Sequence, residues 1–127
     1  MLLEAEVNPT EDAERIKVAF TNFFEHLRLE LLTEDDRQVL RGTAEGERSL
    51  MKFQSLLYQE RIIAAARKVL LRGVRGNEIT FFLNRQVAFA GHISFCKPIG
   101  ESPLGPIMAR IFTEDPRALI DWLTPVV

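Results

Sequence analysis

Apolar and charged residues alternate near the start of the chain, and this period of two predicts a β-strand. Leu3, Ala5 and Val7 would point into a core, whereas Glu4 and Glu6 lie between them and would point to solvent. A strand with one apolar face needs a covering layer, so we expect helices to pack on that face.

A helix is predicted to follow, running from Asn8 to about Phe24. Asn8 suits the N-cap, Pro9 the first helical position and Glu11 the acid of a capping box. Apolar side chains then recur at helical spacing and form one stripe. The stripe consists of Ala13, Ile16, Ala19, Phe20, Phe23 and Phe24.

A β-hairpin is predicted next. Leucine alternates with charged residues over residues 27–31, and residues 33–36 form a polar turn. Residues 37–44 then return as the partner strand. The sheet of which this hairpin is part should have two exposed edges, and exposed edges invite pairing between chains.

The rest of the chain predicts helices, three further strands and a last helix. Residues 48–73 are helical in character with a break near Tyr58, and an Asp-Pro pair at residues 115–116 begins the last helix. The three strands cover residues 79–83, 93–95 and 107–111. The order β-α-β-β-α-α-β-β-β-α predicts an α+β two-layer sandwich, in which helices cover a mainly antiparallel sheet. We expect residues 1–127 to form a single domain.

The composition of the chain predicts where in the cell the protein is found. Hydrophobic residues make up 46% of the chain and charged residues 27%, as is normal for a soluble globular protein. The longest nearly apolar run, residues 62–71, is interrupted by Arg67 and Lys68, so we expect no membrane span. The N-terminus does not resemble a signal peptide. A single cysteine, Cys96, cannot form an intrachain disulfide, and we therefore expect a cytoplasmic protein.

The charges are distributed unevenly along the chain. Between Arg48 and Arg85 there are eight Lys or Arg residues and two acids. Residues 1–47 hold twelve acids and five bases, and residues 86–127 hold four and three. The formal net charge of −2 therefore conceals a basic middle. A clustered basic face attracts phosphate backbones even when the total charge is near zero.

Helical geometry places only some of these basic residues on one side of a helix. At about 100° per residue, Arg61, Lys68 and Arg72 fall on one side of a helix, with alanines between them. Such a face would bind nucleic acid in a salt-dependent way, but cations that merely solvate an exposed helix are the commoner case. An exposed Phe82 could add base stacking. The candidate nucleic-acid-binding residues are Arg61, Arg67, Lys68, Arg72, Arg75 and Arg85.

The sequence gives little support for a catalytic site or a metal site. In a Pro- and Gly-rich loop, Ser102 lacks a base in a catalytic motif and Glu101 lacks a second carboxylate. One cysteine and two separated histidines are too few for a zinc site. We therefore expect no catalytic residue, metal or cofactor. Whether the loop is functional or structural stays open. It comprises Glu101, Ser102, Pro103, Leu104, Gly105 and Pro106.

Several segments together resemble an archaeal group, uncharacterised protein family 0201. The resemblance runs from about Leu3 to Pro125, and it is most specific in Ser-Pro-Leu-Gly-Pro-Ile and Asn-Arg-Gln. The family more often has Lys at position 85, where this chain has Arg. The segments are residues 8–12, 65–67, 82–86 with Ala88, Ala90 and Gly91, 101–107 and 119–123.

The resemblance implies a fold like that of a large-subunit ribosomal protein of the L-five type. It implies no catalytic residues, and a related archaeal family is thought to bind RNA. Our leading hypothesis is a non-enzymatic RNA-binding or RNA-associated domain. The alternatives are a protein–protein interaction module or homodimer without nucleic acid and, less favoured, a small enzyme with a pocket near Asn84, Glu101 and Ser102.

Overall fold

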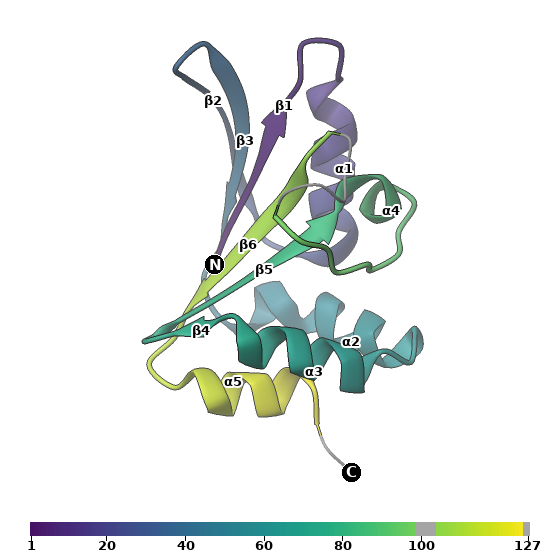
Figure 1. Ribbon diagram of the computed structural model, residues 1–127, viewed down its shortest axis with the longest axis vertical. Helices are drawn as coiled ribbons and strands as arrows, with labels where there is room; N and C mark the ends of the chain where they lie inside the picture. The colour runs from purple at the N-terminus through teal and green to yellow at the C-terminus, as the bar shows by residue number, and fades with distance from the viewer. Residues whose placement is uncertain (99–103, 126–127) are drawn as a thin grey trace.

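Six antiparallel strands form one sheet in the computed structural model, which describes residues 1–98 and 104–125 (Figure 1). The strand order is β2-β3-β1-β6-β5-β4, and every neighbouring pair is antiparallel. The strands are β1 (Leu2–Val7), β2 (Arg28–Glu34), β3 (Arg37–Thr43), β4 (Val74–Arg75), β5 (Glu78–Asn84) and β6 (Pro106–Phe112). The predicted α+β architecture is confirmed.

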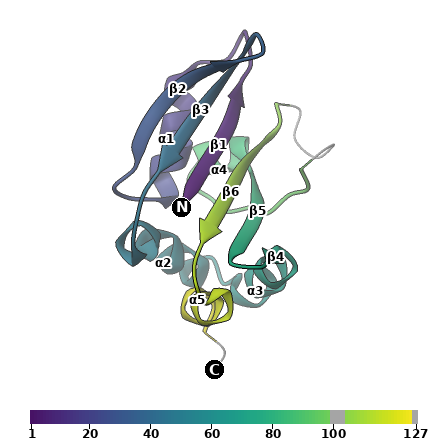
Figure 2. The ribbon, with the colours of Figure 1, turned by 90° about the vertical axis from the view of Figure 1, so that its left-hand side faces the viewer.

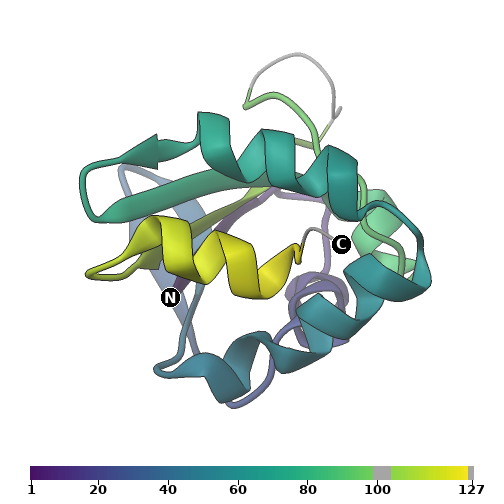
Figure 3. The same ribbon diagram turned by 90° about the horizontal axis from the view of Figure 1, so that it is seen from below.

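The helices lie in two groups. Helices α1 and α4 lie behind the sheet in the view of Figure 2, and the other helices gather beyond one end of it (Figures 1 and 2). Seen from below, α5 lies between α3 and α2 (Figure 3). The helical elements are α1 (Ala13–Phe23), the 3-10 turn η1 (Glu47–Leu50), α2 (Met51–Gln59), α3 (Ile63–Arg72), α4 (Arg85–Phe89) and α5 (Pro116–Leu123). No helix in the described ranges is long and apolar enough to cross a bilayer.

Phenylalanine rings join the two groups of helices to the sheet. Phe53 of α2 stacks on Phe24, which follows α1, with 5.1 Å between ring centroids, and on Phe81 of β5 at 5.7 Å. All three rings are almost completely buried. Such aromatic pairs stabilise the fold beyond the area that they bury. The predicted apolar stripe of α1 is buried in this core, apart from a half-buried Ala13.

The predicted start of α1 was wrong. The helix begins at Ala13, and its N-cap is Asp12, whose side chain accepts from the Glu14 N–H. Asn8 instead forms a turn in which its backbone N–H and side chain both donate to Glu11 Oε1. Asn8 also donates to Leu104 O, which holds this turn to a distant loop.

The segment after β5 also differs from the prediction. Residues 93–95 contribute only an isolated bridge between Phe95 and Leu83, not a full strand. Helix α4 and the two-residue strand β4 were not predicted, because both are too short to show a period. Asn84 begins α4 by accepting from the N–H groups of Gln86 and Val87.

Candidate nucleic-acid interface

The corner between α2 and α3 is built by a helix-ending motif. The Ile62 N–H donates to Leu57 O at 3.2 Å, and the Arg61 N–H donates to Tyr58 O at 3.1 Å. Arg61 adopts a φ of +56°, the left-handed conformation that this motif requires and that glycine usually supplies. Arg61 therefore lies in the turn before α3, not within the helix as predicted.

Beyond this turn, α3 carries only two cations of the predicted line, Lys68 and Arg72, because Arg61 precedes the helix. Ala64, Ala65, Lys68 and Arg72 are exposed, as is Arg61 itself. The opposite side of the helix buries Ala66 and Leu70 completely. The line thus consists of long cations separated by small side chains. We call Arg61, Lys68 and Arg72 the basic line.

The basic line has no ion-pair partner in the described part of the chain. The acids near it are engaged elsewhere: Asp121 with Arg67, and Glu78 with Arg110. Glu60, next to Arg61 in the sequence, accepts from the Ile93 N–H. The positive potential of the line is therefore not cancelled by a paired carboxylate.

Arg75 continues the line at the end of α3. It lies on β4 and is exposed. Its guanidinium donates to Arg72 O and Val74 O at 3.2 and 2.7 Å. The bond to Arg72 O holds the cation against the last carbonyl of α3, where the helix dipole favours positive charge.

Arg67 does not share the surface of the basic line. Its guanidinium lies 2.7 Å from Asp121 Oδ1 and donates to Thr124 O, so it joins α3 to the end of α5. The hydrogen bond from Arg67 lowers the pKa of the Asp121 carboxyl below its ordinary value. Arg67 has a structural role in joining these two helices.

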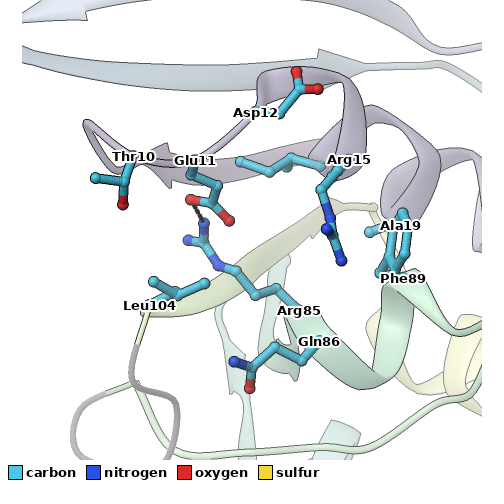
Figure 4. Close-up of a pocket in the computed structure, with 10 residues that line it drawn as sticks. Thr10, Glu11, Asp12, Arg15, Ala19, Arg85, Gln86, Phe89 and Leu104 are labelled. Carbon is cyan, nitrogen blue, oxygen red and sulfur yellow. Dashed lines mark hydrogen bonds and ion pairs between the residues drawn. The ribbon is translucent and has the colours of Figure 1, made fainter.

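Arg85 lies at the other end of β5 from α3 and is buried, with 3% of its surface exposed. Its guanidinium donates to Gly105 O at 2.8 Å and to Glu6 O at 2.6 Å. It also donates to Glu11 Oε1 at 2.8 Å, the contact drawn in Figure 4. A weaker contact reaches Pro106 O at 3.4 Å. The fold therefore does not bring Arg85 to the basic line.

A hollow of about 520 Å³ lies beside Arg85, between α1 and α4 (Figure 4). Its charged groups are engaged: Glu11 pairs with Arg85, Arg15 lies over the ring of Phe89 at 4.3 Å, and Asp12 accepts from the Glu14 N–H. Asn84, a residue of the enzyme hypothesis, is used as the cap of α4. Glu101, Ser102 and Pro103 lie outside the described residues. Within the described ranges, no three His, Cys, Asp or Glu side chains gather as a metal site.

Tyr58 is a candidate that the sequence interpretation missed. Its side chain is 74% exposed at the end of α2. Together with Gln59, Arg61, Ile63 and Ala64 it lines a hollow of about 510 Å³ at the corner. The available signal was the position of the chain's one tyrosine at the predicted break between two helices. An exposed ring beside free cations is a platform on which a base can stack.

The sheet face turned away from α1 and α4 is a less suitable surface for nucleic acid (Figure 2). Two of its arginines are held by acids, Arg41 by Glu4 and Glu34 and Arg37 by Glu6, whereas Arg28 on the edge strand β2 is held by no acid among the described residues. Phe82, on this face, is half-buried and lies opposite Met108. Phosphates approaching here would meet carboxylates that already hold two of the cations.

Comparison with known proteins assigns the chain to a family. A family model described as RNA binding matches residues 2–102. UPF0201 proteins from Sulfurisphaera tokodaii and Metallosphaera sedula are 44% and 39% identical to this chain. Both alignments cover 98% of this chain, and they cover 86% and 87% of the relatives. The chain belongs to the UPF0201 family. The resemblance seen in the sequence is confirmed.

Solved structures of UPF0201 proteins share the fold. The crystal structure of the UPF0201 protein from Methanococcus jannaschii has a TM-score of 0.87 and 30% identity, with 98% of both chains covered. A DUF54 protein from Methanothermobacter thermautotrophicus has a TM-score of 0.70 at 19% identity, covering 97% of this chain and 95% of its own. At this low identity, the second comparison shows a shared fold and nothing about function.

Three of the segments that resemble UPF0201 meet around Arg85. Residues 8–12 contribute Glu11, residues 82–86 contribute Arg85 itself, and residues 101–107 contribute the carbonyls of Gly105 and Pro106. A buried guanidinium needs several acceptors, and these segments supply them. In the part of the loop that the structure describes, residues 104–106 are therefore held to the core of the fold.

Proposed function

We propose that this protein binds RNA through the corner of α2 and α3, without being an enzyme. The observation that carries the proposal is the basic line, three exposed cations with no carboxylate partner among the described residues. The family model described as RNA binding supports the choice of nucleic acid over other polyanions. A cytoplasmic location belongs to the same proposal, since the single cysteine points to a reducing compartment.

In this proposal, the basic line contacts the phosphate backbone. Arg61, Lys68 and Arg72 donate to phosphate oxygens, and Arg75 extends the contact at the end of α3. Ala64 and Ala65 leave room for the backbone to approach the helix closely. Phosphate contacts fix position without reading sequence, so this part of the interface would accept many sequences.

Tyr58 adds a contact to a base in the same proposal. Its ring lies one helical turn before Arg61, so a nucleotide whose phosphate meets Arg61 can place its base on Tyr58. Bases that stack on protein side chains are unpaired, as in loops and bulges of RNA. We therefore expect a preference for structured RNA with an unpaired loop over a continuous duplex.

The proposal is tested by reversing the three charges of the basic line. A variant carrying Arg61→Glu, Lys68→Glu and Arg72→Glu should lose binding to a stem-loop RNA in a filter-binding assay at low salt. Three released counterions per complex predict a slope of log affinity against log salt of about −2 to −3 for the wild-type protein. Absence of wild-type binding at low salt would refute the proposal.

A matched control makes the same change in net charge elsewhere. Arg37, Arg48 and Arg117 are also exposed, but they lie on β3, in η1 and on α5. Their reversal to Glu should leave most of the affinity intact. Equal losses in the two triple variants would mean that total charge, not the basic line, governs binding.

Self-association is a second candidate function, and a specific observation favours it. Strand β2 pairs with β3 along one side over seven residues, and in the described ranges no strand pairs with its other side. An open strand edge is a ready template for pairing with another chain. A homodimer of this kind is compatible with RNA binding, because β2 and α3 belong to different parts of the fold (Figure 1).

A further inference from the structure

The two edges of the sheet are unequal. At one edge, β4 is only two residues long, and beyond it β5 is bonded to the following segment through Asn84 N–H to Ser94 O and Cys96 N–H to Phe82 O. At the other edge, β2 is seven residues long. The β4 edge is therefore short and covered, whereas the β2 edge is long and open.

Strand β2 also lacks several of the features by which natural edge strands avoid pairing, although Arg28, Glu30 and Glu34 on its other face are charged. It contains no Pro, Gly or Lys, and its register with β3 runs through seven consecutive pairs without a bulge. On the side of the sheet that faces α1 it carries Leu29, Leu31 and Thr33, none of which is charged. Edge strands are usually protected by charges pointing inward, by prolines or by bulges.

The direction of the free backbone groups follows from the neighbouring strand. Met1 and Ala44 exchange two hydrogen bonds of 2.8 and 3.1 Å, so the even-numbered residues of β3 bond toward β1. Its odd-numbered residues must then bond toward β2, and their partners on β2 are Arg28, Glu30, Leu32 and Glu34. The N–H and C=O groups of Leu29, Leu31 and Thr33 consequently point out of the sheet.

We propose that β2 pairs with β2 of a second copy of this chain, antiparallel, about a two-fold axis at Leu31. This inference rests on the second candidate function above and specifies its surface. Leu31 is the midpoint of the strand, so this register overlaps all seven residues. It places Leu31 opposite Leu31 of the second copy and joins two six-stranded sheets into one.

Charge complementarity selects the same register. With Leu31 on the axis, Arg28 lies opposite Glu34 of the second copy, and the symmetry repeats this pair. Moving the axis to Glu30 would place Glu30 opposite Glu30. Moving it to Leu32 would place Glu30 opposite Glu34. Both shifts set like charges directly opposite each other, which destabilises a strand pair.

The groups that this register joins are available in the isolated chain. Arg28 is exposed and has no carboxylate partner among the described residues. Glu34 accepts from Arg41 through Oε1, which leaves its Oε2 to receive Arg28 of the second copy. Leu31 is 50% exposed, and pairing covers it with another leucine. A single strand pair is a small interface, so the association is weak and depends on concentration.

Complementary charge reversals test the register. In sedimentation experiments, Arg28→Glu and Glu34→Arg should each raise the dissociation constant at least about tenfold, because each sets like charges opposite one another twice. An equimolar mixture of the two variants should dimerise again, since both pairs of the heterodimer then join opposite charges. Thermal unfolding of each variant monitors folding, because Glu34→Arg also removes the contact with Arg41.

A backbone variant tests the pairing without changing charge. Thr33→Pro removes an N–H that points out of the sheet and leaves the bonds to β3 in place, so it should abolish the dimer. Thr33→Ala keeps that N–H and should leave the dissociation constant within about twofold.

Three results would overturn the inference. A dimer that survives both charge reversals and Thr33→Pro would show self-association through another surface. A mixture that gains nothing over the separate variants would refute the register. A wild-type protein that stays monomeric at every concentration would refute the second candidate function together with this inference, and it would leave RNA binding by the basic line untouched.

Discussion

Arg85 shows how a residue counted as a surface cation in the sequence becomes part of the core. Its acceptors lie 20, 74 and 79 residues away in the chain, so no local pattern around Arg85 reveals them. Burial of a guanidinium is tolerated here because four acceptors surround it. By contrast, the exposure of Lys68 and Arg72 follows from the helical period alone, and it was predicted.

Replacing Arg85 should destabilise the protein strongly. Arg85→Met leaves Glu11 with its charge in a mostly buried site, and removal of one partner of a buried pair costs about 3–5 kcal/mol. Urea unfolding measures the change. The matched control is Arg37→Met, since the Arg37–Glu6 pair is exposed and separated by 3.6 Å. That variant should lose less than about 1 kcal/mol. Equal losses would contradict the structural role of Arg85.

At the scale of elements, the α2–α3 corner shows what periodicity can and cannot predict. The break near Tyr58 was predicted, and so was the exposed side of α3 that carries Lys68 and Arg72. The position of Arg61 in a left-handed turn was not, because a helical wheel assumes that every residue is helical. Glycine is the residue that signals such a turn, and this chain has arginine there.

The turn predicts different effects of two neutral substitutions at Arg61. Arg61→Gly should stabilise the protein by about 0.5–1 kcal/mol, because glycine adopts positive φ without a Cβ clash. Arg61→Ala keeps the Cβ and should show no such gain. Both variants remove the cation and should weaken RNA binding alike. A gain in the alanine variant would show that the charge, not the backbone conformation, is destabilising.

The contact between α3 and α5 predicts a pH dependence. The pKa of Asp121 is lowered from an ordinary value of 3.8, chiefly by the hydrogen bond from Arg67. A carboxyl group with a lowered folded-state pKa stabilises the fold above 3.8, and this contribution is lost as the pH falls through the folded-state value. Asp121→Asn should therefore reduce stability at pH 7, and the difference from wild type should shrink toward pH 3.

A neighbouring arginine provides the control for this pH dependence. Arg117 lies 3.6 Å from the same carboxylate, farther than Arg67. Arg117→Gln should retain most of the dependence, which urea unfolding at the two pH values can show. If Arg67→Gln also retained it, the assigned cause of the shift in the pKa of Asp121 would be wrong.

For the whole molecule, the sequence predicted most of the order of helices and strands. It did not predict which cations lie on the surface and which are buried or join helices. Alternation and helical stripes predicted the antiparallel sheet and its helical layer. The pairing order β2-β3-β1-β6-β5-β4 depends on contacts between distant segments. That order makes β2 an open edge. Along the chain, α3 precedes the β4–β5 hairpin, whereas Arg85 follows β5. The basic middle of the sequence is thereby divided into a surface line, a helix-joining Arg67 and a buried Arg85.

The hydrogen bonds of Arg85 with Glu6, Glu11, Gly105 and Pro106, together the Arg85 cluster, have a consequence for the order of folding events. The cluster joins the end of β1, the start of α4 and the start of β6, so loops of up to 79 residues must close before it can form. We expect it to be absent from the folding transition state. Stopped-flow kinetics of Arg85→Met should therefore show faster unfolding at a nearly unchanged folding rate. The hydrogen bonds of Arg85 would then slow unfolding and so lengthen the lifetime of the native protein.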